Sequence, residues 1–256
     1  MSKLLEGKSA LVLGVANRWS LAYAIAEAFQ REGAGVALTY QADRQREAVE
    51  ALAQELGASQ VLPCDVSQDQ ELTALAETLR SAPGRIDAVV HSIAFANRED
   101  LGRTFLETSR AGFALAQDIS VYSLVAVARA LAPLMTAGGS ITTLTYLGST
   151  RVVPNYNVMG AAKAALEAAM RYLASELGPR GIRVNAISAG PIKTASARAI
   201  KDFSSILDFV AGRAPLRGNT EPGEIADAAV FLASDLGRGV TGNILFVDSG
   251  FQIMGL

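Results

Sequence analysis

Short apolar segments alternate with longer segments of helical period along most of the chain. The short segments are rich in Val, Ile, Leu and Thr, which is typical of buried strands. The pattern predicts strands at Ser9–Leu13, Gly35–Tyr40, Gln60–Pro63, Ala88–His91, Ser140–Thr145, Arg183–Ile187 and Asn243–Val247. Between them it predicts helices at Leu21–Arg31, Arg44–Leu56, Gln70–Arg80, Ala111–Leu131, Tyr156–Glu176 and Glu221–Ala233.

This alternation of strands and helices indicates repeated βαβ units, because parallel strands need crossover connections. The strands are continuously apolar, as in a sheet that is covered on both faces. We therefore expect an α/β fold: a single Rossmann-type, doubly wound parallel sheet of about seven strands with helices on both faces. No repeat or linker interrupts residues 1–256, so we expect one dinucleotide-binding catalytic domain. The long irregular segment near 192–216 is a candidate functional loop.

Composition and charge exclude several classes of protein. The chain has 23 Lys and Arg against 25 Asp and Glu, a net charge of −2, so we expect no nucleic-acid partner. Cys64 is the one cysteine and His91 the one histidine, which excludes an internal disulfide and a zinc cluster, and we expect no metal. The N-terminus does not resemble a signal peptide, and no run reaches the roughly 18 apolar residues of a membrane span. We expect no membrane association and a cytoplasmic location.

The segment after the first predicted strand is a candidate dinucleotide-binding loop. Gly14 permits a tight turn, and Ser20 can cap the following helix, whose free amides attract a pyrophosphate. The glycine fingerprint of Rossmann proteins is incomplete here, so an ordinary strand-to-helix turn with a serine cap remains an alternative.

Two further strand ends are candidate adenosine contacts. Gln41 follows the second strand without adjacent basic residues, which favours NADH over NADPH. Arg44 and Arg46 could still approach a 2′-phosphate, although solvated helix charges are the simpler interpretation. Asp65 follows the third strand and could accept a hydrogen bond from adenine or cap a turn.

Three side chains could act as acids, bases or donors. His91 ends the fourth predicted strand, but no partner carboxylate is evident, so we expect a structural histidine. Tyr156 and Lys163 are seven residues apart, which places both on one face of a predicted helix. A tyrosine hydroxyl and an ammonium group can together stabilise an oxyanion. This spacing also arises by chance in many helices.

Four motifs carry a specific resemblance. They are DISVYS at 118–123, YLGS at 146–149, PNYNVMGAAK at 154–163 and RVNAISAGP at 183–191. In these motifs, and in the Ser20 loop and the VDSGF segment near the C-terminus, the chain resembles enoyl-acyl-carrier-protein reductases, a divergent branch of the short-chain dehydrogenases/reductases. Six residues separate Tyr156 from Lys163, a wider gap than in most short-chain dehydrogenases. This gap distinguishes enoyl reductases from ketoreductases.

The resemblance implies roles for individual residues. Tyr156 would bond the thioester carbonyl as it becomes an enolate, Lys163 would bind the nicotinamide ribose, and Tyr146 would be a second active-site tyrosine. Ala96 would lie beside the substrate, together with both tyrosines. The chain departs from the family at Ala94, where some members have Gly. The implied cofactor-binding positions are Gly14, Ser20, Leu21, Gln41, Asp65, Val66, Ile93, Lys163, Ile192, Lys193, Thr194, Ala195 and Ser196.

The resemblance also implies the reaction, reduction of trans-2-enoyl thioesters on acyl-carrier protein with NADH, and a homotetramer. The apolar side chains of the segment near 192–216 would form a lid over the acyl chain; they are Ile200, Phe203, Ile206, Leu207 and Phe209. Two alternatives remain open. One is a reductase of the same fold that acts on a ketone, against which the wide gap argues. The other is a regulatory nucleotide-binding protein without turnover, which should show damage at Tyr156 or Lys163, and neither is damaged.

Overall fold

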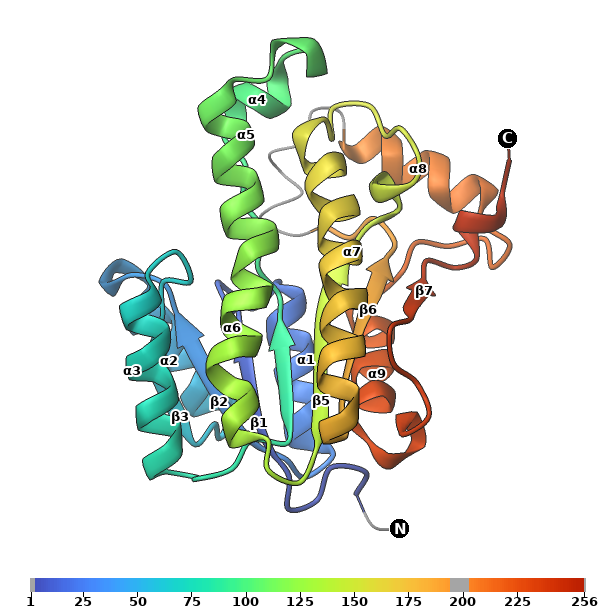
Figure 1. Cartoon of the computed structure of the whole chain (residues 1–256). Helices are drawn as coiled ribbons and strands as arrows, with labels where there is room; N and C mark the ends of the chain where they lie inside the picture. Colours follow the sequence, from blue (N-terminus) through green and yellow to red (C-terminus); the bar gives the residue numbers. More distant parts are fainter. Residues whose placement is uncertain (1–2, 194–202, 256) are drawn as a thin grey trace.

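The computed structural model describes residues 3–193 and 203–255 (Figure 1). Its seven parallel strands form one sheet in the order β3-β2-β1-β4-β5-β6-β7, which confirms the Rossmann-type sheet expected from the sequence. The strands are β1 (Ser9–Leu13), β2 (Gly35–Tyr40), β3 (Gln60–Pro63), β4 (Ala88–His91), β5 (Gly139–Thr145), β6 (Ile182–Ala189) and β7 (Ile244–Val247). The first four strands have the predicted bounds. β6 is longer than predicted, because Ser188 and Ala189 continue its pairing with β7.

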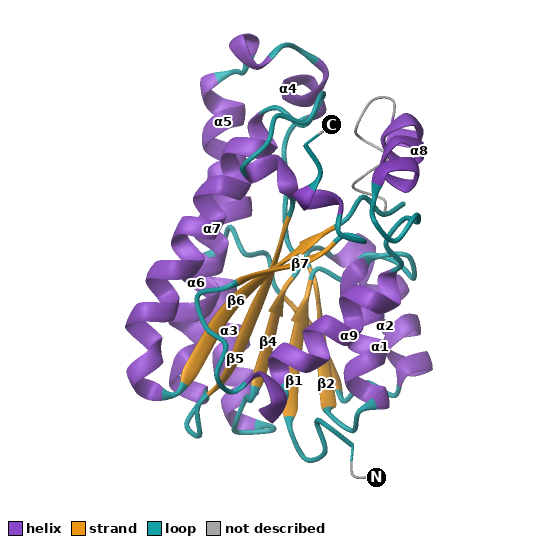
Figure 2. Ribbon diagram, turned by 90° about the vertical axis from the view of Figure 1, so that its right-hand side faces the viewer, coloured by secondary structure: helices purple, strands orange, loops and turns teal. Residues whose placement is uncertain are grey.

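Helices cover both faces of the sheet (Figure 2). The core on one face is formed with α1 (Leu21–Arg31), α2 (Asp43–Leu56) and α9 (Pro222–Ala233). The core on the other face is formed with α3 (Asp69–Ser81), α6 (Ser123–Leu131) and α7 (Val158–Leu177). Side chains such as Phe29 of α1 and Leu131 of α6 are fully buried, and each contributes roughly 1.5–3 kcal/mol by leaving water. These two helix layers bury both faces of the sheet.

The predicted helix Ala111–Leu131 is wrong in one respect, because it is not a continuous α-helix. It consists of α5 (Arg110–Gln117), a π-helical turn η2 (Asp118–Tyr122) and α6. Ser120 in this turn is fully buried, and its hydroxyl donates to Phe95 O (3.1 Å) and accepts from Phe95 N (3.0 Å). The wide turn thus directs Ser120 at the segment after β4. Hydrophobic periodicity did not reveal it, because the apolar face continues through the turn.

The helical run Arg110–Leu134 is long and apolar enough to cross a membrane by length and composition alone, with a mean hydropathy of 1.5 in its most apolar window. Asp118 and Arg129 interrupt this run in the sequence. In the structure, 44% of that window is buried inside the protein, where the run packs against α3 and α7. Packing in the protein core therefore accounts for the apolar side chains in the buried part of this run.

The predicted helix Tyr156–Glu176 starts too early. α7 begins at Val158, because Asn157 has φ 40° and ψ −120°, which is not a helical conformation. Tyr156 therefore lies in the turn before the helix, and the expectation that it shares a helix face with Lys163 is wrong. Asn157 Nδ2 donates to the carbonyl groups of Leu101 (3.1 Å) and Arg103 (2.6 Å), at the end of α4 (Arg98–Gly102). This contact joins the turn to α4.

The segment predicted to form a lid is described in part. Residues 194–202, which include Ile200, lie outside the described residues. Beyond them, α8 (Phe203–Arg213) lies above the carboxyl ends of the strands (Figure 1). Leu207 is buried, whereas Phe209 is 51% exposed and contacts Phe251 edge-to-face at 6.0 Å between ring centroids.

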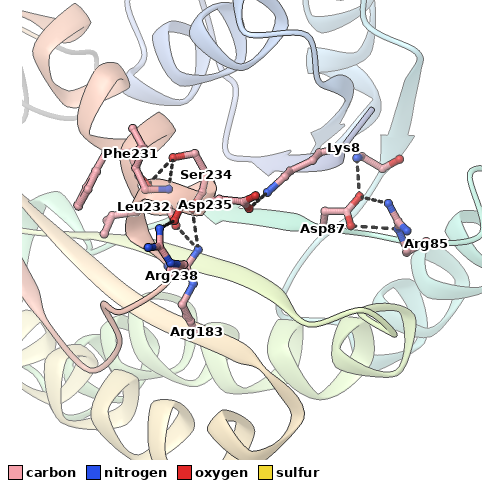
Figure 3. Close-up of polar contacts among 11 residues, drawn as sticks. Lys8, Arg85, Asp87, Arg183, Phe231, Leu232, Ser234, Asp235 and Arg238 are labelled. Atoms are coloured by element: carbon pink, nitrogen blue, oxygen red, sulfur yellow. Dashed lines mark hydrogen bonds and ion pairs between the residues drawn. The ribbon is translucent and has the colours of Figure 1, made fainter. Parts of the chain in front are cut away.

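Charged side chains gather at the opposite, amino end of the sheet (Figure 3). Lys8 Nζ pairs with Asp235 Oδ1 at 2.8 Å, and Asp87 accepts a hydrogen bond from Ser9 N at the start of β1. The Arg183 guanidinium, at the start of β6, donates to backbone carbonyl groups at and beyond the end of α9. Cations at a helix C-terminus are favourable, so these contacts fasten α9 and the amino ends of the strands.

Candidate functional site

The candidate site lies at the carboxyl ends of the strands. β1 is hydrogen-bonded to both β2 and β4, and Leu13 lies opposite His91 in the pairing with β4. After β1 the chain enters α1 on one face of the sheet, and after β4 it continues to α6 on the other face, so the strand order reverses between these two strands. In doubly wound sheets, ligands bind at such a reversal of strand order.

Gly14 is the residue that brings the first loop close to β4. Its φ of 96° suits glycine, and a Cβ at this position would lie 2.1 Å from Ser92 O. Ser20 then caps α1, since its Oγ accepts from Tyr23 N at 3.3 Å. Leu21 begins the helix and packs against the core beneath it. The serine cap is thus confirmed, and the helix start behind it has the form of an anion site.

The ends of β2 and β3 are joined by a side-chain contact. Gln41 Nε2 donates to Asp65 Oδ2 at 3.3 Å, while Asp65 Oδ1 accepts from the backbone and hydroxyl of Ser67. Burial raises the pKa of Asp65, but the bonds from Ser67 and Gln41 outweigh burial and lower it. The turn-capping alternative is therefore confirmed, and an adenine contact through Oδ2 stays a prediction. Val66 is buried beside Asp65.

The arginines that follow Gln41 lie on the surface of α2. Arg46 Nε donates to Glu50 Oε1 at 2.7 Å, one helical turn away, and Arg44 is exposed. The arrangement of Arg46 agrees with the interpretation of a solvated helix charge. No basic side chain directly adjoins Gln41 in the sequence.

His91 is a structural residue, as expected. It is fully buried, with Nδ1 at 3.0 Å from Thr143 Oγ1 and Nε2 at 2.8 Å from Ser123 Oγ. Burial, followed by the nearby charge of Lys163, lowers the pKa of His91 to about 3. Its ring is neutral at pH 7, and both nitrogens are used in tying β4 to β5 and α6.

Tyr146 and Tyr156 form the centre of the site. Their rings meet edge-to-face, with centroids 5.0 Å apart and planes inclined at 72°. Gly148 lies against Tyr156, because a Cβ at Gly148 would be 2.5 Å from Tyr156 Cδ1. Burial raises the pKa of Tyr146 to about 12, and it raises that of Tyr156 further, with added effects of Tyr146 and Glu167. Both phenols are therefore protonated and able to donate a hydrogen bond.

The Lys163 side chain extends from α7 to the end of β5. Its side chain is buried, and Nζ donates to Leu144 O at 2.7 Å, two residues before Tyr146. Burial lowers the pKa of Lys163 to about 8, while Glu167 acts in the opposite direction. The ammonium form therefore predominates at pH 7. The structure brings the predicted pair to one end of β5, through a turn and a helix rather than one helix face.

The predicted substrate position adjoins this pair. Ala96 and Tyr156 both pack against a small apolar cluster formed by Leu101, Ala116, Val158, Met159 and Ala162. Ile93 packs against the core on the side of α3 and α6, and Ala94 is exposed. The chain after β4 thus contributes an apolar wall beside Tyr156.

The remaining predicted cofactor positions follow β6. Ile192 is buried in the core beside α1 and α9, and Lys193 is exposed. Thr194, Ala195 and Ser196 lie outside the described residues.

Two residues of the site had not been predicted. Glu167 is buried on α7 and accepts from Thr145 Oγ1 at 2.6 Å. A signal existed for it, because a carboxylate four residues after Lys163 falls on the same helix face among apolar positions. Gly148 had no such signal, since its contact with Tyr156 depends on how the turn before α7 folds.

These residues fit a nicotinamide dinucleotide. Gly14, with φ 96°, forms the tight turn after β1 that such a site needs, and it leaves no room for a side chain between the loop and the end of β4. The capped start of α1 has free amides that can bind the pyrophosphate. Gln41 and Asp65 have polar groups that can bind the adenosine. Lys163 has a cation that can bind at the nicotinamide end. A metal site is not indicated, because the described residues contain no group of three or more potential metal ligands.

Comparison with known proteins identifies the family. A family model described as enoyl-(acyl carrier protein) reductase matches residues 14–252. The chain is 55% identical to the NADH-dependent enoyl-[acyl-carrier-protein] reductase FabI of Bacillus cereus, over 99% of this chain and 100% of the relative. It is 51% identical to the protein of the same name from Bacillus subtilis, over 99% of each chain.

A solved structure agrees with these relatives. The crystal structure of the Bacillus cereus enoyl-acyl carrier protein reductase with NADP+ and indole naphthyridinone matches with a TM-score of 0.98 and 56% identity. The match covers 99% of this chain and 100% of that one. Sequence and fold thus agree over the whole length, and the chain belongs to the enoyl-[acyl-carrier-protein] reductase family.

Proposed function

We propose that this protein reduces the carbon–carbon double bond of trans-2-enoyl thioesters on acyl-carrier protein with NADH, as the last reductive step of fatty-acid elongation. One observation carries the assignment of residues: the edge-to-face pair of Tyr146 and Tyr156 beside the buried Lys163, at the carboxyl end of β5. Family membership over the whole chain supports the reaction.

Tyr156 is the donor to the substrate. NADH supplies a hydride to the β-carbon of the enoyl group when it is bound. Negative charge then develops on the thioester oxygen, and the Tyr156 hydroxyl stabilises it by donating a hydrogen bond. The raised pKa of Tyr156 keeps the donor proton in place. Protonation at the α-carbon completes the reduction.

Lys163 and Tyr146 support this donor. Lys163 Nζ has three hydrogens, and its bond to Leu144 O uses one of them. The others are available to the ribose hydroxyls of the cofactor. Tyr146 and Gly148 both lie against the ring of Tyr156 and restrain it. Pre-organised donors of this kind need no rearrangement during the reaction.

The cofactor is held along the ends of β1, β2 and β3. Gly14 and the capped start of α1 receive the pyrophosphate, and Gln41 with Asp65 receives the adenosine. NADH is favoured over NADPH, because no paired cations adjoin Gln41. The NADH-dependent relatives support this preference.

The chain functions as a single domain with a lid near 192–216, as a cytoplasmic homotetramer. The described part of the lid contains the amphipathic α8, and Phe209 on it is half exposed. Two large apolar side chains exposed on the helical run from α5 to η2 favour burial between subunits; they are Phe113 and Tyr122.

The test compares two variants in an assay of NADH oxidation with crotonyl thioester. Tyr156→Phe is expected to lower kcat by about 10²- to 10³-fold with NADH binding nearly intact, because it removes a donor that acts in the transition state. Lys163→Ala is expected to weaken NADH binding as well as turnover. Tyr172→Phe, an exposed tyrosine of α7, is the matched control and should behave like the wild type.

Two outcomes contradict the proposal. Full turnover by Tyr156→Phe, together with normal NADH binding by a folded Lys163→Ala, would show that the pair is structural. If the wild type reduces a β-ketoacyl thioester faster than crotonyl thioester, the alternative of a reductase of the same fold that acts on a ketone is favoured.

A further inference from the structure

Two charged side chains of α7 are buried one helical turn apart. Lys163 and Glu167 are only 6% and 4% exposed, and their spacing of four residues makes them neighbours on one helix face. Both contact the end of β5: Lys163 Nζ donates to Leu144 O at 2.7 Å, and Glu167 Oε1 accepts from Thr145 Oγ1 at 2.6 Å. These contacts lie directly before Tyr146 in the chain.

From this arrangement we infer that Glu167 is a positioning residue for the reduction, which keeps the Lys163 ammonium charged beside the cofactor ribose. The inference rests on the role proposed for Lys163 above. Glu167 acts through its charge on Lys163, while Thr145 holds its carboxylate by a hydrogen bond, and Glu167 needs no contact with the cofactor or the substrate.

The hydrogen bond from Thr145 satisfies one oxygen of the buried Glu167 side chain. A distance of 2.6 Å is typical of a hydroxyl that donates to a carboxylate. A buried carboxylate is costly unless it has a hydrogen bond and a nearby opposite charge. Lys163 supplies that charge across one turn of the helix. Within the described residues, the ammonium has no ion-pair contact shorter than 4.0 Å, and its hydrogen bond to Leu144 leaves two hydrogens for a ligand.

The other titratable groups around Lys163 do not replace Glu167. His91 of β4 is neutral at pH 7, since its pKa is lowered to about 3. The phenols of Tyr146 and Tyr156 are protonated, and Asp248, after β7, acts on Tyr146. Glu167 therefore opposes the effect of burial on the pKa of Lys163, and it also raises the pKa of Tyr156. Both effects of Glu167 favour the protonated forms of Lys163 and Tyr156, which can then donate hydrogen bonds.

The test follows NADH binding from pH 6 to pH 10. The chain has a single tryptophan, Trp19, which is exposed on the loop between Gly14 and Ser20, so its quenching reports the bound cofactor. For the wild type we expect affinity to fall as pH rises through about 8, where Lys163 loses its proton. For Glu167→Gln we expect this midpoint to move down by about one to two pH units, since a charge one helical turn away is removed.

Three further variants make the result specific. Glu167→Met also removes the charge, and it should shift the midpoint in the same direction if the glutamine variant fails to fold. Thr145→Val removes the hydrogen bond but keeps the charge, so Tm should fall while the midpoint stays near that of the wild type. Glu176→Gln removes an exposed carboxylate from the same helix and should change neither quantity.

The outcomes separate this inference from the proposed function. If Lys163→Met abolishes the fall in NADH affinity at high pH but neither Glu167 variant moves the midpoint, Glu167 has only a structural role. If Thr145→Val moves the midpoint as far as Glu167→Gln, geometry rather than charge controls Lys163 and the inference is overturned. If Lys163→Met binds NADH with the same pH dependence as the wild type, the proposed role of Lys163 fails as well.

Discussion

Replacing Gly14 with alanine tests whether the loop after β1 is part of the cofactor site. In Gly14→Ala the new Cβ would lie 2.1 Å from Ser92 O and 2.8 Å from Ser92 C. Ordinary contact begins near 3.4 Å, so the carbonyl oxygen must retreat by about 1.3 Å. Ser92 N is bonded to Leu13 O at 3.2 Å, immediately before Gly14. The ends of β1 and β4 must therefore separate at the proposed cofactor site.

The free energy of unfolding is expected to fall by about 3 kcal/mol. The φ of 96° adds conformational strain of roughly 1–2 kcal/mol for a residue with a Cβ. Overpacking against backbone adds roughly 1–3 kcal/mol more. For a domain of this size each kcal/mol lowers Tm by roughly 2–4 °C, so we expect a fall of about 6–12 °C.

Thermal unfolding and Trp19 quenching measure the two consequences separately. Gly14→Ala should lower Tm and also weaken NADH binding by at least about tenfold, because the amides of the loop are displaced. Gly212→Ala is the matched control. Gly212 lies on α8 with nothing within 4 Å of its added Cβ, and alanine favours a helix. Its Tm should stay equal or rise slightly.

The reasoning is refuted by a Gly14→Ala protein that unfolds within about 2 °C of the wild type and binds NADH normally. Such a result would mean that β1 and β4 separate without cost. A lower Tm with unchanged NADH affinity would leave the packing argument intact but would remove Gly14 from the cofactor site.

Three further predictions concern charge and mobility. Lys163 has a folded pKa of about 8 against an ordinary 10.5; the cost of burying its charge is fully present below pH 8 and disappears by about pH 10.5. The stability of the wild type should therefore rise between about pH 8 and pH 10.5 in denaturant titrations, and Lys163→Met should lack this rise. A difference in stability between the two proteins that does not change with pH contradicts the shift. Steady-state kinetics should give a higher kcat/KM with NADH than with NADPH, and the reverse would implicate Arg44 or Arg46. Hydrogen exchange in α8 should slow when NADH and an acyl mimic bind, and equal protection with and without ligands would argue against a lid.

The local pattern of the sequence was sufficient for much of the fold. Strand bounds such as Ser9–Leu13 and Ala88–His91 were predicted correctly, because a buried parallel strand is a short apolar run bounded by turn residues. The serine cap at Ser20 was predicted for the same reason, since a cap depends on residues three positions apart. The alternation of strands and helices then limits the topology, and the topology places the ligand site at the carboxyl ends.

The helix ends near the site were less predictable. The apolar pattern runs through Tyr156 and Asn157, but the positive φ of Asn157 ends the helix before Tyr156. The side chain of Asn157 is held there by carbonyl groups of Leu101 and Arg103, more than fifty residues earlier. The π-helical turn at Ser120 depends in the same way on a distant partner, Phe95. Such contacts leave no local periodicity.

The sequence by itself determined the strands, the capped loop proposed to bind the cofactor and, through its motifs, the candidate residues Tyr156 and Lys163. Only the tertiary structure decided how Tyr156 and Lys163 are brought to the same end of β5. Tyr156 arrives on a turn and packs on Tyr146 and Gly148, while Lys163 arrives on α7 beside the buried Glu167. The protonation states of these groups follow from burial and from charges on other elements, which depend on distances in space. Periodicity and spacing along the chain record neighbours in sequence, and they do not contain those distances.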